Sequence, residues 1–222
     1  MITRSLPSDR RTTLSYVALG DSTVYGLGAT SPSRHFVGRL FERIRHEYPN
    51  ARLVNRGVCM ATAADVLAQQ VPDAILDRPH LVTLSVGPND LRRGFTPQDF
   101  ALRVEVILER LHRETEATVV VNRLPEMEFC PRFSKAERSL VGAMTRYYNH
   151  ALQHVVDGFG IELIDIGVAD RPEAERQRFF SADGYHPSDE GYAAWADAVW
   201  GAVNRLIPNP PVERKRLVAN IA

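Results

Sequence analysis

The chain of 222 residues has few cysteines and no long apolar run. Its two cysteines, Cys59 and Cys130, do not fall into the Cys/His spacing of a zinc site, and two free thiols are the simpler interpretation. No apolar stretch approaches the length that crosses a membrane, and residues 1–16 lack the apolar core of a signal peptide. The sequence therefore predicts a cytoplasmic protein without a membrane span.

A surplus of charge is also absent. Lys and Arg total 27, Asp and Glu total 27, and the formal net charge at pH 7 is zero. Domains that bind nucleic acid usually carry a basic surplus, so this balance argues against nucleic acid as a partner. The composition, with 44% hydrophobic and 24% charged residues, is ordinary for a globular protein. The oligomeric state stays open.

Short apolar runs alternate along the chain with segments of helical periodicity. The runs typical of strands are 14–19, 51–57, 80–87, 117–122 and 160–166. Helical spacing of apolar residues is found over 34–48, after Thr62, from 96, from 134 and after Ser188. The strands are continuously apolar, as in a parallel sheet covered by helices on both faces. The sequence thus predicts a three-layer α/β fold with a five-stranded parallel sheet.

The domain boundaries follow from the ends of this alternation. We expect one α/β domain over residues 14–207, preceded by an N-terminal segment of residues 1–13. After Leu206 the stretch "IPNPPVERKR" combines prolines, which end a helix, with basic residues. Residues 208–222 are therefore interpreted as a Pro-rich, basic C-terminal tail.

Polar residues follow three of the predicted strands at the point where each ends. These exits are Gly20-Asp21-Ser22, Asn55-Arg56-Gly57 and Gly87-Pro88-Asn89-Asp90. Because the carboxyl ends of parallel strands meet at one edge of a sheet, the three exits are expected to lie together. The stretch "SADGYHPSDEGY" at 181–192 follows the fifth strand and can return to the same edge.

The residue types at this edge fit acyl transfer. Ser22 can act as a nucleophile once His186 takes its proton, and Asp183 can orient that imidazole. The backbone N–H groups of Gly57 and Ser22, together with the Asn89 amide, can form an oxyanion hole.

Blander interpretations exist for each of these residues. Ser22 alone could be a helix cap, and Asn89-Asp90 could be an ordinary turn. The Gly/Ser/Thr-rich loop after the first strand could also cradle a phosphate in a flavodoxin-like nucleotide-binding module. That alternative leaves the spacing of Asp183 and His186 unexplained.

The four blocks "GDS", Gly57, "GPND" and "DGYH" occur in order and resemble those of the SGNH, or GDSL, hydrolases. The resemblance spans residues 17 to about 200. It implies a flavodoxin-like sheet with strand order 2-1-3-4-5 and hydrolysis of esters or thioesters through an acyl-serine. Ser22 matches the nucleophile, Gly57 and Asn89 the oxyanion donors, Asp183 the orienting acid and His186 the base. We expect neither a cofactor nor a metal.

One departure from the motif is Thr23, which stands where "GDSL" has its leucine and is not a catalytic group in this scheme. The leading prediction is a serine esterase that hydrolyses small-molecule esters with small or mid-sized acyl groups, since no extended lid sequence is present. An acyltransferase, thioesterase, lysophospholipase or carbohydrate deacetylase would use the same residues.

The substrate pocket is less specified by the sequence. Aromatic and sulfur-containing residues after the third and fourth strands could line an acyl pocket or belong to the core; they are Phe95, Met127, Phe129 and Phe133. Arg92 and Arg93 could meet an anionic group of the substrate or lie in solvent. Cys59, two residues past Gly57, could face the pocket.

Overall fold

The computed structural model describes residues 4–168 and 170–208. Its sheet is entirely parallel, with strand order β2-β1-β3-β4-β5. The strands are β1 (Ser15–Gly20), β2 (Arg52–Asn55), β3 (Leu81–Ser85), β4 (Thr118–Asn122) and β5 (Leu163–Ile164). The predicted parallel sheet and its order are confirmed. The predicted C-terminal tail lies outside the described residues, apart from Pro208.

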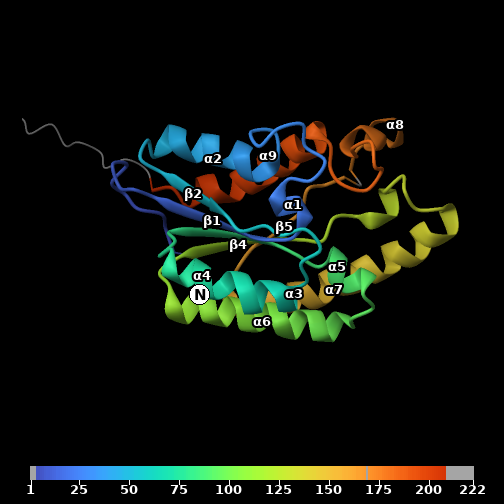
Figure 1. The fold of residues 1–222 in the computed structure, drawn as a ribbon, viewed down its shortest axis with the longest axis horizontal. Helices are drawn as coiled ribbons and strands as arrows, with labels where there is room; N and C mark the ends of the chain where they lie inside the picture. Colours follow the sequence, from blue (N-terminus) through green and yellow to red (C-terminus); the bar gives the residue numbers. More distant parts are fainter. Residues whose placement is uncertain (1–3, 169, 209–222) are drawn as a thin grey trace, which may run out of the picture.

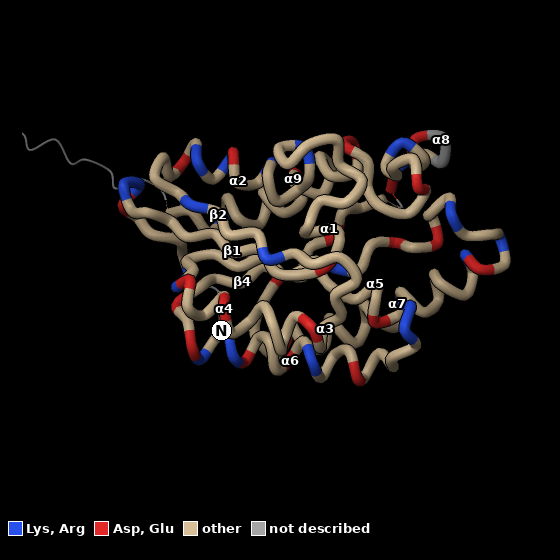
Figure 2. Tube along the Cα trace, viewed as in Figure 1, with Lys and Arg blue, Asp and Glu red and all other residues tan. Residues whose placement is uncertain are grey.

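Helices cover both faces of the sheet (Figure 1). Helices α2 (Phe36–Glu47) and α9 (Asp189–Arg205) lie on one face, and α4 (Val71–Leu76), α6 (Pro97–Glu114) and α7 (Lys135–Phe159) lie on the other. Strand β1 alternates between the two cores: Val17 and Leu19 pack toward α6 and α7, and Tyr16 and Ala18 toward α2 and α9. Figure 2 shows residues of both charge signs along α6 and α7, away from the sheet.

The predicted helix starts are confirmed by their capping bonds. The side chain of each cap accepts a hydrogen bond from a backbone N–H three residues further on; the caps are Thr62, Thr96, Ser134 and Ser188. The helix after Thr62 is not continuous. It runs as α3 (Ala63–Asp65), a π-helical turn η1 (Val66–Gln70) and then α4.

The edge strands β2 and β5 are shorter than the predicted runs 51–57 and 160–166. Each has a sheet partner on one side only, β1 for β2 and β4 for β5. Beyond β2 the chain keeps bonding to β1 in a looser form, with Arg56 N–H donating to the Ala18 carbonyl and Val58 N–H to that of Gly20. The second exit therefore still reaches the carboxyl edge of the sheet.

Short helices fill the loops that follow the strands. They are α1 (Ser22–Tyr25), α5 (Pro88–Arg92), the 3₁₀ turns η2 (Met127–Phe129) and η3 (Gln177–Phe179), and α8 (Glu173–Arg176). All of them come after a strand, so they gather at the carboxyl edge of the sheet. Among the described residues no helix has the length and apolarity to span a membrane.

The N-terminal segment packs along the opposite, amino edge. Leu6 is buried, and its N–H donates to the Leu206 carbonyl at 2.8 Å. The Tyr48 hydroxyl donates to the Pro7 carbonyl at 2.7 Å. These bonds tie the described part of the segment to the ends of α9 and α2.

Candidate active site

Ser22 is the first residue of α1, directly past the end of β1. The helix cap is its neighbour Asp21, whose Oδ1 accepts hydrogen bonds from both the N–H and the hydroxyl of Thr23, each at 2.9 Å. This arrangement leaves the Ser22 hydroxyl free for another partner, and the interpretation of Ser22 as the cap is wrong. As the first helical residue, Ser22 has no intrahelical acceptor for its own N–H.

The turn into α1 depends on Gly20 and Gln70. Gly20 has φ +149°, and a Cβ there would come within 1.9 Å of the Ser85 carbonyl oxygen. Its N–H donates to Gln70 Oε1 at 2.8 Å, and its carbonyl accepts from Gln70 Nε2 at 2.9 Å. Gln70, at the end of the π-turn η1 and 4% exposed, thus bonds to β1 as a neighbouring strand would. Sequence reasoning missed it, although an amide on the buried face of a helix was a signal.

Ser22, His186 and Asp183 form one hydrogen-bonded chain. Ser22 Oγ lies 3.0 Å from His186 Nε2, and His186 Nδ1 lies 2.6 Å from Asp183 Oδ2. The three residues come from opposite ends of the sequence, and the structure brings them together as predicted. An imidazole between a hydroxyl and a carboxylate can accept a proton from the first while the second stabilises the charge it gains.

Asp183 is an ionised carboxylate held by its own loop. Its Oδ1 accepts hydrogen bonds from Ser181 Oγ, Tyr185 N–H and His186 N–H at 2.8, 2.8 and 2.9 Å. Burial by itself raises the pKa of Asp183, but the bonds from His186, Tyr185 and Ser181 outweigh it and hold the pKa far below its usual range. The partner of His186 is therefore charged at neutral pH.

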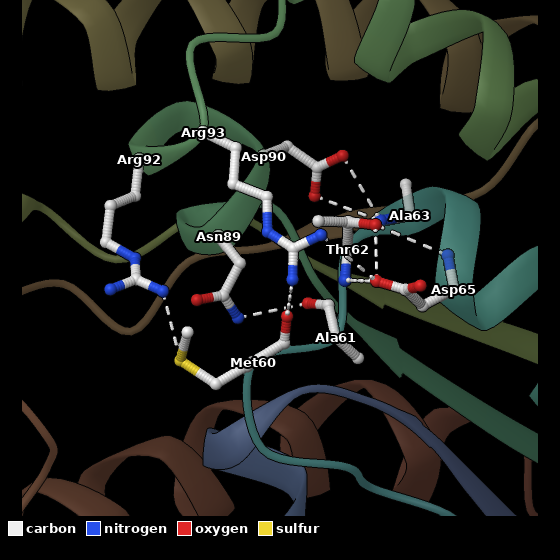
Figure 3. A network of polar contacts seen from close by, with 9 residues as sticks. All are labelled: Met60, Ala61, Thr62, Ala63, Asp65, Asn89, Asp90, Arg92 and Arg93. Carbon is white, nitrogen blue, oxygen red and sulfur yellow. Dashed lines mark hydrogen bonds and ion pairs between the residues drawn. The ribbon is translucent and has the colours of Figure 1, made fainter.

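Asn89 lies in α5, 7% exposed, and lines the same cavity as Ser22. One proton of its amide goes to the Ala61 carbonyl at 3.0 Å. Its neighbour Asp90 accepts the Ala63 N–H at 3.0 Å, so both residues connect α5 to the loop after β2 (Figure 3). Through this bond Asp90 braces the two loops against each other. Burial raises the pKa of Asp90 to about 6, against the lowering effect of the Ala63 bond.

Gly57 is not brought to the cavity. Its N–H donates to Asn55 Oδ1 at 2.9 Å, and it is absent from the residues that line the cavity. A Cβ at this position would come within 2.3 Å of the Tyr25 backbone nitrogen. The glycine thus allows the loop after β2 to pack on the end of α1, and this geometry contradicts its predicted role as an oxyanion donor.

Met60, three residues after Gly57, lines the cavity that Gly57 does not reach. Sequence reasoning did not single it out. Its backbone is left-handed, with φ +70°, which is unusual for a residue with a side chain. Arg92 Nη2 donates to Met60 Sδ at 3.0 Å, and Arg93 Nη2 donates to its carbonyl at 3.2 Å (Figure 3). Met60 lines the cavity with Ser22 and Asn89, and within the described ranges its N–H has no hydrogen-bond partner. Nothing in the residue type signals this conformation.

The cavity beside Ser22 has a volume of about 550 Å³ and mostly apolar walls. Of the residues expected there, Met127, Phe133 and Cys59 line it. Phe95 and Phe129 do not: each ring carries a guanidinium on its face, that of Arg103 and Arg176 respectively. In the described part of the chain no group of three or more His, Cys, Asp or Glu side chains is placed to hold a metal ion.

Comparison with known families identifies the class of the protein. The model of the GDSL-like lipase/acylhydrolase family matches residues 18–194, and the chain belongs to that family. It is therefore a serine hydrolase of carboxylic esters.

Individual relatives are distant. Esterase TesA of Pseudomonas aeruginosa is 24% identical over 86% of this chain and 88% of its own length. The crystal structure of LAE5, an α/β hydrolase from the metagenome of Lake Arreo in Spain, superposes with a TM-score of 0.68 at 21% identity, covering 90% of this chain and 100% of that one. An acetyl xylan esterase, AlAXEase, superposes with a TM-score of 0.70 at 18% identity, over 86% and 100%. These two structures share the fold.

Proposed function

We propose that the protein is an esterase for small or mid-sized acyl groups in which Ser22 is the nucleophile, His186 the general base and Asp183 the orienting acid. The observation that carries this proposal is the hydrogen-bonded chain from Ser22 Oγ through His186 to Asp183, with links of 3.0 and 2.6 Å. Both links lie within the reach that proton transfer needs.

The reaction then follows from the positions of these groups. His186 Nε2 takes the Ser22 proton as Oγ attacks the ester carbonyl, and Asp183 stabilises the imidazolium that forms. The imidazolium gives its proton to the departing alcohol, which leaves an acyl-serine. Water enters, loses a proton to His186 and attacks the acyl carbon. The carboxylic acid departs, and Ser22 recovers its proton.

The proposed oxyanion donors are the N–H of Ser22, the side-chain amide of Asn89 and the N–H of Met60 in place of Gly57. Ser22 and Met60 each have an N–H that their own helix or loop leaves without an acceptor, and the Asn89 amide keeps one proton after bonding to Ala61. A single donor of this kind typically lowers the barrier by about 3 kcal/mol.

The size and lining of the cavity support the proposed substrate range. A volume of about 550 Å³ with walls that include Met127 and Phe133 suits an apolar acyl group. One superposable structure is an acetyl xylan esterase, so this fold can accept a short acyl group. Transfer of the acyl group to an alcohol instead of water would use the same residues, and product analysis with an added acceptor separates the two.

The test is hydrolysis of p-nitrophenyl acetate, butyrate, octanoate and palmitate by the wild type, Ser22→Ala and the control Ser33→Ala. Ser33 is an exposed serine outside the cavity. We expect Ser22→Ala to keep less than about a thousandth of the wild-type kcat, as loss of a triad member does, and Ser33→Ala to keep all of it. Equal rates in Ser22→Ala and the wild type would overturn the proposal, and fastest turnover of palmitate would overturn the substrate range.

A further inference from the structure

Two arginines at the cavity that holds Ser22 have no acidic partner. Arg92, on α5, contacts Met60 Sδ and is exposed, and Arg132 is exposed beside the loop that carries His186. Both line the cavity, and in the described part of the chain neither forms an ion pair within 4.0 Å. Arg56, which does not line the cavity, is by contrast paired with Asp73 and Asp77.

Arg132 is fixed next to the catalytic loop by its backbone. Its N–H donates to the Gly184 carbonyl at 3.0 Å, within the turn between Asp183 and His186. Arg92 lies on α5, the short helix that also carries Asn89. The two guanidinium groups therefore come from two different segments that line the cavity of Ser22.

Tyr185 lies between these segments. Its ring is half-buried in the cavity wall, 5.0 Å from the His186 ring and 6.0 Å from that of Phe133, centroid to centroid. Burial raises the pKa of Tyr185 to about 12, with further raising by Cys130 and Asp21, while Arg92 and Arg132 both lower it. Both cations thus act electrostatically on one hydroxyl, which has no hydrogen-bond partner among the described residues.

Two acids also line the cavity. Asp21 is buried beside Ser22, and its carboxylate accepts a hydrogen bond from the Thr23 N–H. Glu126 also lines the cavity and is not without a partner. Among the described residues, Asp21 forms no ion pair with Arg92 or Arg132. A cavity with apolar walls and two unpaired guanidinium groups fits an ester that is apolar near the reacting carbon and anionic at one end.

We propose that the substrates of this protein are esters bearing an anionic group, a carboxylate or a phosphate, which Arg92, Arg132 and the Tyr185 hydroxyl bind at the cavity. This inference rests on the proposed function of Ser22. Guanidinium groups form charge-assisted hydrogen bonds with both kinds of anion, and a phenol adds a neutral donor. The anion sits on either the acyl or the alcohol half of the ester, and the experiment separates these two sources.

The experiment compares matched esters that differ in one charge. For the acyl half the pair is mono-p-nitrophenyl glutarate and p-nitrophenyl pentanoate, with non-enzymatic hydrolysis subtracted. For the alcohol half it is 4-acetoxybenzoate and its methyl ester. Each pair is assayed with the wild type, Arg92→Gln, Arg132→Gln and Tyr185→Phe. The control is Arg123→Gln, since Arg123 is paired with Asp165 and does not line the cavity.

In one of the two pairs, we expect Arg92→Gln and Arg132→Gln each to lower kcat/KM for the anionic ester about 5- to 20-fold more than for its neutral partner, mainly through KM. Tyr185→Phe lowers the same ratio by about 2- to 5-fold. Raising the salt concentration weakens the wild-type preference, because these charges face solvent. The pair that responds identifies the half of the ester that carries the anion.

Unchanged ratios in both pairs for both arginine variants would overturn this inference. Its failure is distinguishable from failure of the proposed function, because Ser22→Ala abolishes turnover of every ester if Ser22 is the nucleophile. Any effect of Arg92→Gln that arises through Met60 lowers both members of a pair equally and leaves the ratio unchanged. An equal change of the kcat/KM ratio in Arg123→Gln would show that net charge, not this site, causes the preference. That result would also contradict the inference.

Discussion

The loop that carries Ser22 is held by residues far away in the sequence, whereas the loop that carries His186 is held mainly by itself. Gly20 is bonded through both its N–H and its carbonyl to the Gln70 side chain, and Asp21 N–H donates to the Ser85 carbonyl at 3.2 Å. In the other loop, three donors from residues 181–186 converge on Asp183 Oδ1. Ser22 is thus positioned by the sheet, and His186 by a local turn.

This difference separates stability from activity. The bonds around Gly20 are buried, so breaking them leaves polar groups without partners and costs folding free energy. The bonds around Asp183 face solvent more, and breaking them changes the orientation of His186 while water replaces the lost partner. Substitutions near Gly20 are therefore expected to lower the free energy of unfolding more than the activity. Substitutions near Asp183 are expected to lower the activity more than the free energy of unfolding.

The largest effect is expected from Asp183→Asn. The amide cannot stabilise the imidazolium and favours the wrong tautomer of His186, so kcat should fall by about 10³- to 10⁴-fold. Steady-state kinetics on p-nitrophenyl butyrate measure the loss of kcat, and urea unfolding of the same preparation measures the change in the free energy of unfolding. A variant with more than a tenth of the wild-type kcat would show that Asp183 does not orient His186.

The next largest effect is expected from Gln70→Leu, with Gln69→Leu as the matched control. Gln70 is buried and makes two bonds to Gly20, while Gln69 is its exposed neighbour on the same π-turn. Loss of the amide leaves the Gly20 N–H unsatisfied, and we expect a cost of about 2–4 kcal/mol in the free energy of unfolding. Urea denaturation measures it. Equal losses in the two variants would mean that Gln70 does not support β1.

A smaller, pH-dependent effect is expected from Asp90→Asn. Burial raises the folded-state pKa of Asp90 to about 6, above its usual 3.8, so its contribution to stability is full at low pH and lost as the pH rises through 6. Asparagine stays neutral and can still accept the Ala63 N–H. Relative to the wild type, the variant should therefore gain about 2 kcal/mol in unfolding free energy between pH 4 and pH 7.5.

The matching measurement is urea unfolding of both proteins at several pH values across this window. Asp21, whose pKa burial also raises to about 6, is present in both proteins, and its charge is a minor cause of the raised pKa of Asp90. A difference between variant and wild type that stays constant with pH would contradict the buried, titrating state of Asp90.

The smallest effect is expected from Ser181→Ala, which removes one of three donors to Asp183 Oδ1. The backbone N–H groups of Tyr185 and His186 remain, so kcat/KM should fall by only about 3- to 5-fold, in line with one exposed hydrogen bond. The exposed Ser139→Ala is the control. A loss of activity in Ser181→Ala as large as that in Asp183→Asn would mean that the backbone N–H groups of Tyr185 and His186 do not keep Asp183 in place.

The sequence was sufficient for the fold and for the meeting of Ser22, Asp183 and His186, because these residues follow strands and a parallel sheet brings its strand ends to one edge. It was insufficient for Met60 and Gly57. The path of their loop depends on Arg92 and Arg93, which are more than thirty residues away and reach Met60 only in the folded chain.

The role of Gln70 could not be predicted from the sequence for a related physical reason. Its helical spacing suggests a residue of the core, yet the π-turn η1 directs its amide at the end of β1. The ends of β2 and β5 were overestimated because apolar runs mark which residues are buried, not which have a strand beside them on both sides.

The packing of the N-terminal segment has a practical consequence for how the protein can be attached to a surface. Leu6 bonds to Leu206, and the Arg10 guanidinium donates to the Pro208 carbonyl at 2.8 Å, so both ends of the described chain lie at the amino edge of the sheet. Ser22 stands at the carboxyl edge, a strand length of about 20 Å away. A bead or electrode coupled near residue 4 or residue 208 would therefore leave Ser22, the proposed nucleophile, facing the bulk solution.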